Sequence, residues 1–148
     1  MIIELIAAFA GSIGFAMILN MKHKQVFFAG LGGILSWGVY LVVYHFVGSY
    51  FISNFLAAVF VAVYAEIMAR VNRAPTTIFL TAAAVPLIPG RNLYETMYGI
   101  VTENYASARI NGVTTLVIAL AIGLGFVFVT VIFNFVNRYN SRGSRRNV

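Results

Sequence analysis

The sequence predicts an all-α integral membrane protein with about five transmembrane helices, the fourth of them discontinuous. Hydrophobic residues make up 61% of the 148-residue chain, charged residues make up 9%, and the mean hydropathy is +0.89, a balance that excludes a soluble globular domain. Apolar runs long enough for a spanning helix of about 20 residues recur along the chain. Pro86, Pro89 and Gly90 then break an apolar segment in which a helix is otherwise expected.

We predict one transmembrane helical domain over residues 1–137, followed by a basic cytoplasmic tail over residues 138–148. The first apolar run has no basic start, carries Glu4 and lacks a small-residue cleavage pattern, so we expect a retained helix rather than a signal peptide. The chain has no cysteine, which excludes disulfides and thiolate metal sites. The predicted spans are residues 2–20, 25–47, 50–69, 76–106 (broken) and 112–136.

The sequence lacks the motifs of most enzymes. Phosphate-binding loops, dinucleotide fingerprints and paired-histidine metal motifs are absent, and no nucleophile–base pair stands at usable spacing. We therefore expect no enzyme, no catalytic residue, no metal, no cofactor and no nucleic-acid partner.

Basic residues predict the orientation, because lysine and arginine mark cytoplasmic loops. Five crossings place all the basic residues of the first and third connections and of the tail in the cytoplasm, with the N-terminus outside. If the fourth segment were re-entrant, four crossings would put the tail opposite Lys22 and Arg73. We favour five crossings of the plasma membrane. The residues counted are Lys22, Lys24, Arg70, Arg73, Arg138, Arg142, Arg145 and Arg146.

The proline break predicts a ligand site. Residues 78–89 cover only about 18 Å of a bilayer core about 30 Å thick, so a second half-helix is expected at about residues 93–106. Asn92 and Glu95 have the spacing of a capping box. The junction would offer unpaired amides and a positive helix end to a carboxylate, beside Arg91. Alternatively, the prolines only kink a packing helix, and Arg91 snorkels to the interface or pairs with Glu95.

The third span carries a ridge of small and polar residues spaced four apart: Asn54, Ala58, Ala62, Glu66 and Arg70. The small residues allow a neighbouring helix to approach closely. Glu66 is a carboxylate well inside an apolar span and is therefore a candidate for proton coupling. The alternative is a structural ion pair with Arg70, four residues on.

Other small residues predict further packing faces, while Trp37 and several tyrosines are expected at the membrane interfaces. Five short spans are too few to enclose a transport pathway, which indicates assembly with another subunit, the alternative being a homo-oligomer. The predicted packing pairs are Ala7/Gly11, Ala10/Gly14, Ala29/Gly33 and Gly123/Gly125.

Three segments resemble a known family. Residues 14–20, residues 85–90 followed by Tyr94, and residues 119–123 are similar to the threonine/serine exporter family, in particular to the small subunit of its split, two-component form. That subunit corresponds to the C-terminal half of the fused exporter, and the similarity covers nearly the whole chain. The motif positions that carry over are Gly14, Phe15, Asn20, Pro86, Pro89, Gly90 and Tyr94, whereas Glu66, Arg70 and Arg91 lie outside the motifs.

The resemblance implies proton-driven export of small carboxylate-bearing metabolites, either threonine and serine or a dicarboxylate such as succinate. It also implies a larger membrane subunit of the same family as an obligate partner. The competing interpretation is a scaffold subunit that does not itself transport and that stabilises a transporting partner.

Overall fold

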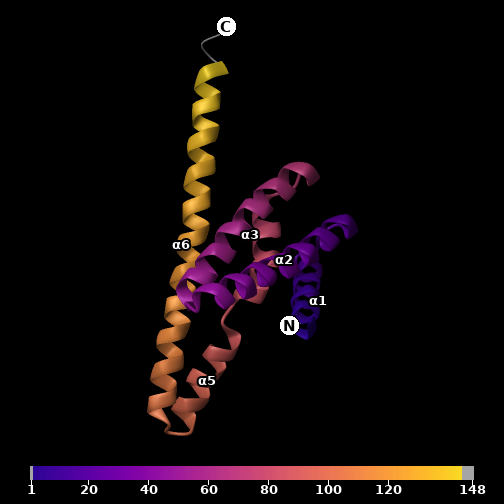
Figure 1. Ribbon diagram of the computed structural model, residues 1–148. Helices are drawn as coiled ribbons and strands as arrows, with labels where there is room; N and C mark the ends of the chain where they lie inside the picture. The colour runs from indigo at the N-terminus through magenta and orange to yellow at the C-terminus, as the bar shows by residue number, and fades with distance from the viewer. Residues whose placement is uncertain (1, 145–148) are drawn as a thin grey trace.

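Helices joined by short connections make up the chain that the structure describes, residues 2–144 of a computed structural model with side chains as far as residue 135 (Figure 1). No strand occurs in this part, and the predicted all-helical class is confirmed for it. The side chains of the predicted basic tail lie outside the described residues. The elements are α1 (Ile2–Ile18), α2 (His23–Val47), α3 (Tyr50–Asn72), α4 (Thr76–Ala84), the 3₁₀ turn η1 (Val85–Leu87), α5 (Gly90–Val101) and α6 (Tyr105–Ser144).

Three of the described helices are long and apolar enough to cross a membrane: α2, α3 and the Tyr105–Phe135 part of α6. Two shorter apolar segments accompany them, α1 and the Thr76–Leu87 segment that joins α4 to η1. The composition of these five segments agrees with an integral membrane protein.

Left-handed residues set the ends of two helices. At Asn20 φ is 55°, and the Met21 amide donates to the Ala16 carbonyl oxygen at 3.2 Å, so α1 ends at Ile18 rather than at residue 20. At Arg73 φ is 49°, which ends α3 at Asn72 rather than at residue 69. Asparagine tolerates the left-handed conformation better than most residues, which explains its position after α1.

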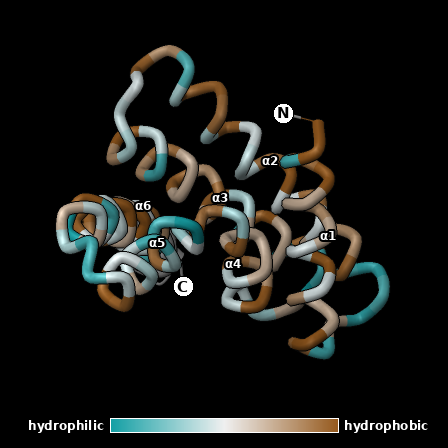
Figure 2. Tube along the Cα trace, turned by 90° about the horizontal axis from the view of Figure 1, so that it is seen from below, coloured by the Kyte–Doolittle hydropathy of each residue, from teal (hydrophilic) through white to brown (hydrophobic). Residues whose placement is uncertain are grey.

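The core lies where α4 packs among α1, α2 and α3 (Figure 2). Phe79 of α4 is fully buried against Ala65 and Ala69 of α3. Farther along, Ala83 and Leu87 form a second buried cluster with residues of α3. Because alanine side chains are short, the helix backbones approach closely around a few larger buried side chains such as Phe79 and Leu87.

The segment after η1 leaves this bundle. In Figure 1, α5 runs beside the first part of α6, and the two join at a tight turn distant from α1. A Cβ on Gly99 would lie 2.9 Å from the Ala108 amide nitrogen, so the two helices can pack this closely only with glycine at that position. The pair α5 and α6 forms a hairpin of its own.

The turn of this hairpin corrects two predicted boundaries. Glu103 is left-handed with φ of 59°, and the Asn104 Oδ1 atom accepts the Ser107 amide at 3.3 Å. Asn104 thus acts as the N-cap of α6, which begins at Tyr105 instead of residue 112. The second half-helix consequently covers Gly90–Val101 rather than residues 93–106.

The small residues predicted as packing faces are buried in some helices and exposed in α1. The buried small residues of α1 are Ala8, Ser12 and Ala16, whereas the predicted pairs Ala7/Gly11 and Ala10/Gly14 are exposed within the described chain. Successive helix positions point about 100° apart, and the contacts of α1 with α2, α4 and η1 decide which of them is buried. The other two predicted pairs lie in α2 and α6. Ala29 and Gly33 of α2 are both buried, whereas in α6 Gly125 packs against Ala58 and Gly123 is exposed.

Candidate functional site

The chain between α4 and α5 is irregular because two prolines stand close together. Proline lacks an amide N–H and disfavours helical backbone in the residue before it. After η1, Ile88 is extended with φ of −63° and ψ of 126°, and α5 begins beyond Pro89, at Gly90. The helical axis is therefore interrupted over Ile88 and Pro89.

A side chain of α2 forms a hydrogen bond with a backbone carbonyl group at the end of α4, just before this break. The Ser36 hydroxyl lies 3.0 Å from the Ala83 carbonyl oxygen and 2.8 Å from the Gly33 carbonyl oxygen of its own helix. Ser36 is fully buried. A hydroxyl from a neighbouring helix is one of the ways in which a break at membrane depth becomes tolerable.

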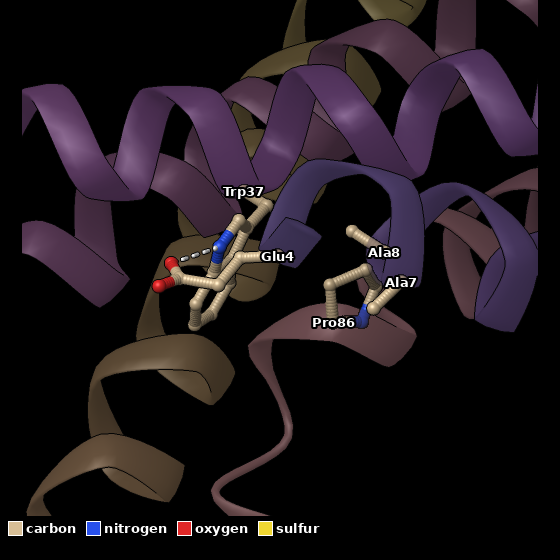
Figure 3. A pocket seen from close by; sticks show the side chains of 5 residues that line it. All are labelled: Glu4, Ala7, Ala8, Trp37 and Pro86. Carbon is tan, nitrogen blue, oxygen red and sulfur yellow. Dashed lines mark hydrogen bonds between the residues drawn. The ribbon is translucent and has the colours of Figure 1, made fainter. Parts of the chain in front are cut away.

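An open pocket of about 280 Å³ lies next to the break. Its lining residues are Glu4, Ala7 and Ala8 of α1, Trp37 of α2 and Pro86 of η1 (Figure 3). The Trp37 Nε1–H donates to the Glu4 Oε2 atom at 3.3 Å. The pocket therefore combines one carboxylate with an indole and a largely apolar wall.

Glu4 and Trp37 were not predicted as site residues. A carboxylate within the first apolar run is the signal that could have identified Glu4, because acids in such runs are functional candidates by default. The sequence predicts Trp37 at a membrane interface. Ten residues of α2 follow Trp37, however, so it lies about 15 Å along the helix axis from the last residue, Val47. Glu4 bonds to Trp37 and thus lies level with the interior of α2 rather than with its end.

The first turn of α5 differs from the prediction. The helix begins at Gly90 without any side-chain cap, so the predicted capping box of Asn92 and Glu95 is wrong. Because α5 starts before Asn92, that residue lies within the helix, and its carbonyl oxygen accepts the Thr96 hydroxyl at 2.7 Å. Within the described part of the chain, no partner is found for the backbone amides of Arg91 and Asn92.

The predicted site residues on α5 do not meet at the pocket. Arg91, Asn92 and Tyr94 are absent from its lining, whereas Pro86 contributes to it. Tyr94 is exposed and stacks on Tyr98 with a centroid separation of 6.1 Å. Among the described residues, Arg91 forms no ion pair with Glu95, and its side chain is exposed.

Glu66 and Arg70 pair with each other away from the pocket. Their Oε2 and Nη2 atoms are 3.8 Å apart, and the Arg70 guanidinium lies 5.2 Å from the centroid of the Phe133 ring of α6. Asn54, at the other end of the same ridge, is buried and donates through Nδ2 to the Tyr50 carbonyl oxygen at 2.8 Å. The Glu66–Arg70 pair and the Asn54 hydrogen bond are both consistent with a structural role in the packing of α3.

Of the three motif residues predicted in and just after α1, Asn20 acts through its backbone, whereas Gly14 and Phe15 are exposed. Asn20 closes the helix, and its amide donates to the Met17 carbonyl oxygen at 3.0 Å. A Cβ on Gly14 would meet nothing within 4 Å, and Phe15 is exposed.

The fold and the pocket together define a helical membrane protein with a broken segment beside a small, largely apolar pocket that contains one carboxylate. Membrane transporters use broken segments of this kind. Residues 4–132 match a family model described as Threonine/Serine exporter, ThrE. The chain belongs to the threonine/serine exporter family. No solved structure matches it. No group of three or more potential metal-ligating side chains occurs among the residues described.

Proposed function

We propose that the chain is a subunit of a proton-coupled secondary exporter of small carboxylate-bearing metabolites. The observation that carries this proposal is the interruption between α4 and α5 beside the pocket, in a chain of the threonine/serine exporter family. Transporters commonly build their substrate sites from broken helices near the middle of the bilayer.

In this proposal the α4–α5 segment makes the fourth of five crossings. α4 with η1 has 12 residues and α5 has 12 residues, about 18 Å each, so together they match a bilayer core of about 30 Å. The basic residues of the first and third connections then lie in the cytoplasm with the tail, and the N-terminus lies outside.

The substrate carboxylate is expected at the first turn of α5. The Arg91 and Asn92 amides lack partners in the described part, and they lie at the positive end of the helix dipole. A Cβ on Gly90 would meet nothing within 4 Å, so this approach is open. The exposed Arg91 side chain is long enough to supply a charge-assisted hydrogen bond.

The α5–α6 hairpin supports a larger partner subunit. Its surface includes many large apolar side chains that no other part of the described chain covers. A broken crossing inside a bilayer must be packed in protein or line a wet cavity, so we place the larger exporter subunit against this hairpin. The exposed residues are Leu93, Tyr94, Met97, Tyr98, Ile110, Val113, Leu116 and Leu120.

We assign Glu66 to an ion pair rather than to proton movement. Its carboxylate already pairs with Arg70, and Arg70 contacts α6 through Phe133.

Counterflow in proteoliposomes tests the proposed function. This chain is reconstituted with and without the larger subunit, and exchange of labelled threonine, serine and succinate is measured in parallel. We expect saturable exchange only when both subunits are present. Exchange by the larger subunit alone would make this chain a scaffold, and no exchange of any substrate would overturn the proposal.

Two variants then test the break itself. Pro89→Ala restores an amide at the interruption, and Gly90→Ala adds a methyl group at the start of α5 where the chain leaves open space. We expect both to lose exchange while still assembling with the partner. Unchanged exchange in both variants would exclude the break from the substrate site.

A further inference from the structure

We propose that the connection between α1 and α2 and the connection between α3 and α4 together bind the phosphate headgroup of an anionic phospholipid. The headgroup site consists of Lys22 and Lys24, at the start of α2, and Arg73, directly after α3. It lies on the side of the bundle away from the α5–α6 turn (Figure 1). The site does not depend on which substrate the protein carries.

Packing brings the two connections to the same end of the bundle. Met21 of the first connection and Ala74 of the third both pack against the buried cluster that contains Phe79. Lys22 directly follows Met21, and Arg73 directly precedes Ala74. Residues that are far apart in the sequence thus supply positive charge to one region of the surface.

The first connection has a fixed backbone. The Met21 amide donates to the Ala16 carbonyl oxygen at 3.2 Å, and the Lys22 amide donates to Oε1 of the buried Gln25 side chain at 3.2 Å. The side chains of Lys22 and Lys24 are nevertheless exposed. Both ammonium groups are therefore accessible on a backbone that is already ordered before a ligand binds.

Arg73 occupies a backbone position that suits glycine. Its φ and ψ are both 49°, and its amide bonds to the carbonyl oxygens of Ala69 and Arg70 at the end of α3. Glycine adopts this left-handed conformation without steric cost, whereas an arginine is strained in it. Because the backbone gains nothing from an arginine here, the strain points to a function of the exposed side chain.

No acidic residue neutralises the headgroup site from within the two connections. Residues 19–24 and 71–77 contain neither aspartate nor glutamate. Among the residues that the structure describes, Arg70 pairs with Glu66, whereas Lys22, Lys24 and Arg73 form no ion pair. In the proposed orientation these cations face the cytoplasmic leaflet, whose anionic lipids give it a negative surface potential.

Apolar side chains beside the cations favour a phospholipid over a soluble anion. Ile18 and Leu19 lie just before the first connection, Val71 lies just before Arg73, and all three are exposed. The planar guanidinium of Arg73 suits two phosphate oxygens at once. A phospholipid offers a phosphate to the cations and acyl chains to the apolar side chains, whereas a soluble anion offers only the first.

Native mass spectrometry of the full-length chain, released from neutral detergent micelles, measures this binding directly. The chain is titrated with phosphatidylglycerol, with phosphatidylcholine of the same acyl chains, and with glycerophosphoglycerol, the phosphatidylglycerol headgroup without its chains. We expect a saturable adduct with phosphatidylglycerol alone. Phosphatidylcholine has no net charge, and glycerophosphoglycerol has no acyl chain.

A double variant, Lys22→Gln with Arg73→Gln, removes two of the three charges. Each basic side chain near an anionic surface contributes about a fivefold gain in affinity, so we expect the double variant to bind phosphatidylglycerol about 25-fold more weakly. The matched control is Arg109→Gln, which removes an exposed positive charge from the α5–α6 hairpin and should bind as the native chain does.

The variant Arg73→Gly separates binding from folding. Glycine relieves the left-handed strain and removes the guanidinium, so the midpoint of thermal unfolding in neutral micelles should not fall, while the affinity for phosphatidylglycerol falls about fivefold.

Five results would overturn the proposal. They are native affinity for phosphatidylglycerol in the double variant, an equal loss of affinity in Arg109→Gln, equal adducts with phosphatidylcholine, equal binding of glycerophosphoglycerol, and no adduct with any of the three.

Discussion

The contact between α3 and α6 gives a sharp test of the packing, because it depends on the absence of a single methyl group. A Cβ at Gly125 would lie 2.8 Å from the Ala58 Cβ atom and 3.0 Å from the Phe55 carbonyl oxygen. Neither atom belongs to a flexible side chain, so Gly125→Ala must push the helices apart. Gly123, on the same helix, has nothing within 4 Å of its Cβ position and supplies the matched control.

The expected cost follows from these distances. Carbon atoms pack best at about 3.5–4.0 Å, so the contact must open by about 1 Å. Overpacking of this kind costs about 1–3 kcal/mol. Alanine also gains about 0.5–1 kcal/mol over glycine in a helix interior. Both Gly125→Ala and Gly123→Ala share that gain, so the difference between their free energies of unfolding isolates the clash, at about 1–3 kcal/mol.

Reversible unfolding in mixed micelles, followed by far-UV circular dichroism as the fraction of denaturing detergent rises, measures both variants. We expect Gly125→Ala to be the less stable variant, and we expect the second change Ala58→Gly to restore part of the loss. Equal stability of the two alanine variants would refute the assigned α3–α6 contact.

Three further changes test the bundle and the ion pair. Tyr64→Phe removes the hydroxyl that donates to the Phe28 carbonyl oxygen at 2.7 Å and should cost about 0.5–1.5 kcal/mol in the same unfolding assay, whereas native stability would contradict the bond. Ser36→Ala takes the donor from the Ala83 carbonyl at the break and should cost about 1–3 kcal/mol and speed hydrogen exchange in η1; unchanged exchange there would exclude this role. Glu66→Gln breaks a long, partly exposed ion pair and should change stability by at most about 1 kcal/mol while leaving proton-driven counterflow intact. Loss of the proton dependence would return Glu66 to the coupling mechanism.

Asn20 and the two prolines show what short-range chemistry determines. Asparagine accepts the left-handed backbone that ends α1, and Pro86 and Pro89 lack the amide N–H that an uninterrupted α-helix needs at those positions. These constraints act on the backbone within a few residues, and therefore the sequence predicts them. The apolar runs behave similarly, because length and hydropathy are properties of each segment by itself.

The capping box at Asn92 shows the limit of such reasoning. The Asn-x-x-Glu spacing is present, yet α5 begins earlier at Gly90, and it is Asn104 that caps the following helix. Several residues near a break are acceptable caps, and the packing of Gly99 against Ala108 helps select where the hairpin turns. A local pattern with more than one solution is resolved only by contacts distant in the chain.

The pocket is the clearest case of a feature that only the tertiary structure decides. The sequence by itself determines an all-helical membrane chain with an interruption near Pro86, because these depend on the hydropathy of each segment and on a missing amide at a given position. It does not bring Glu4 to Trp37 or either of them to Pro86, since these residues lie on three separate elements. These three residues come together because α1 and α2 pack against the break. Alanine and glycine let the helix backbones approach closely there, which places the Glu4 carboxylate within hydrogen-bonding distance of Trp37.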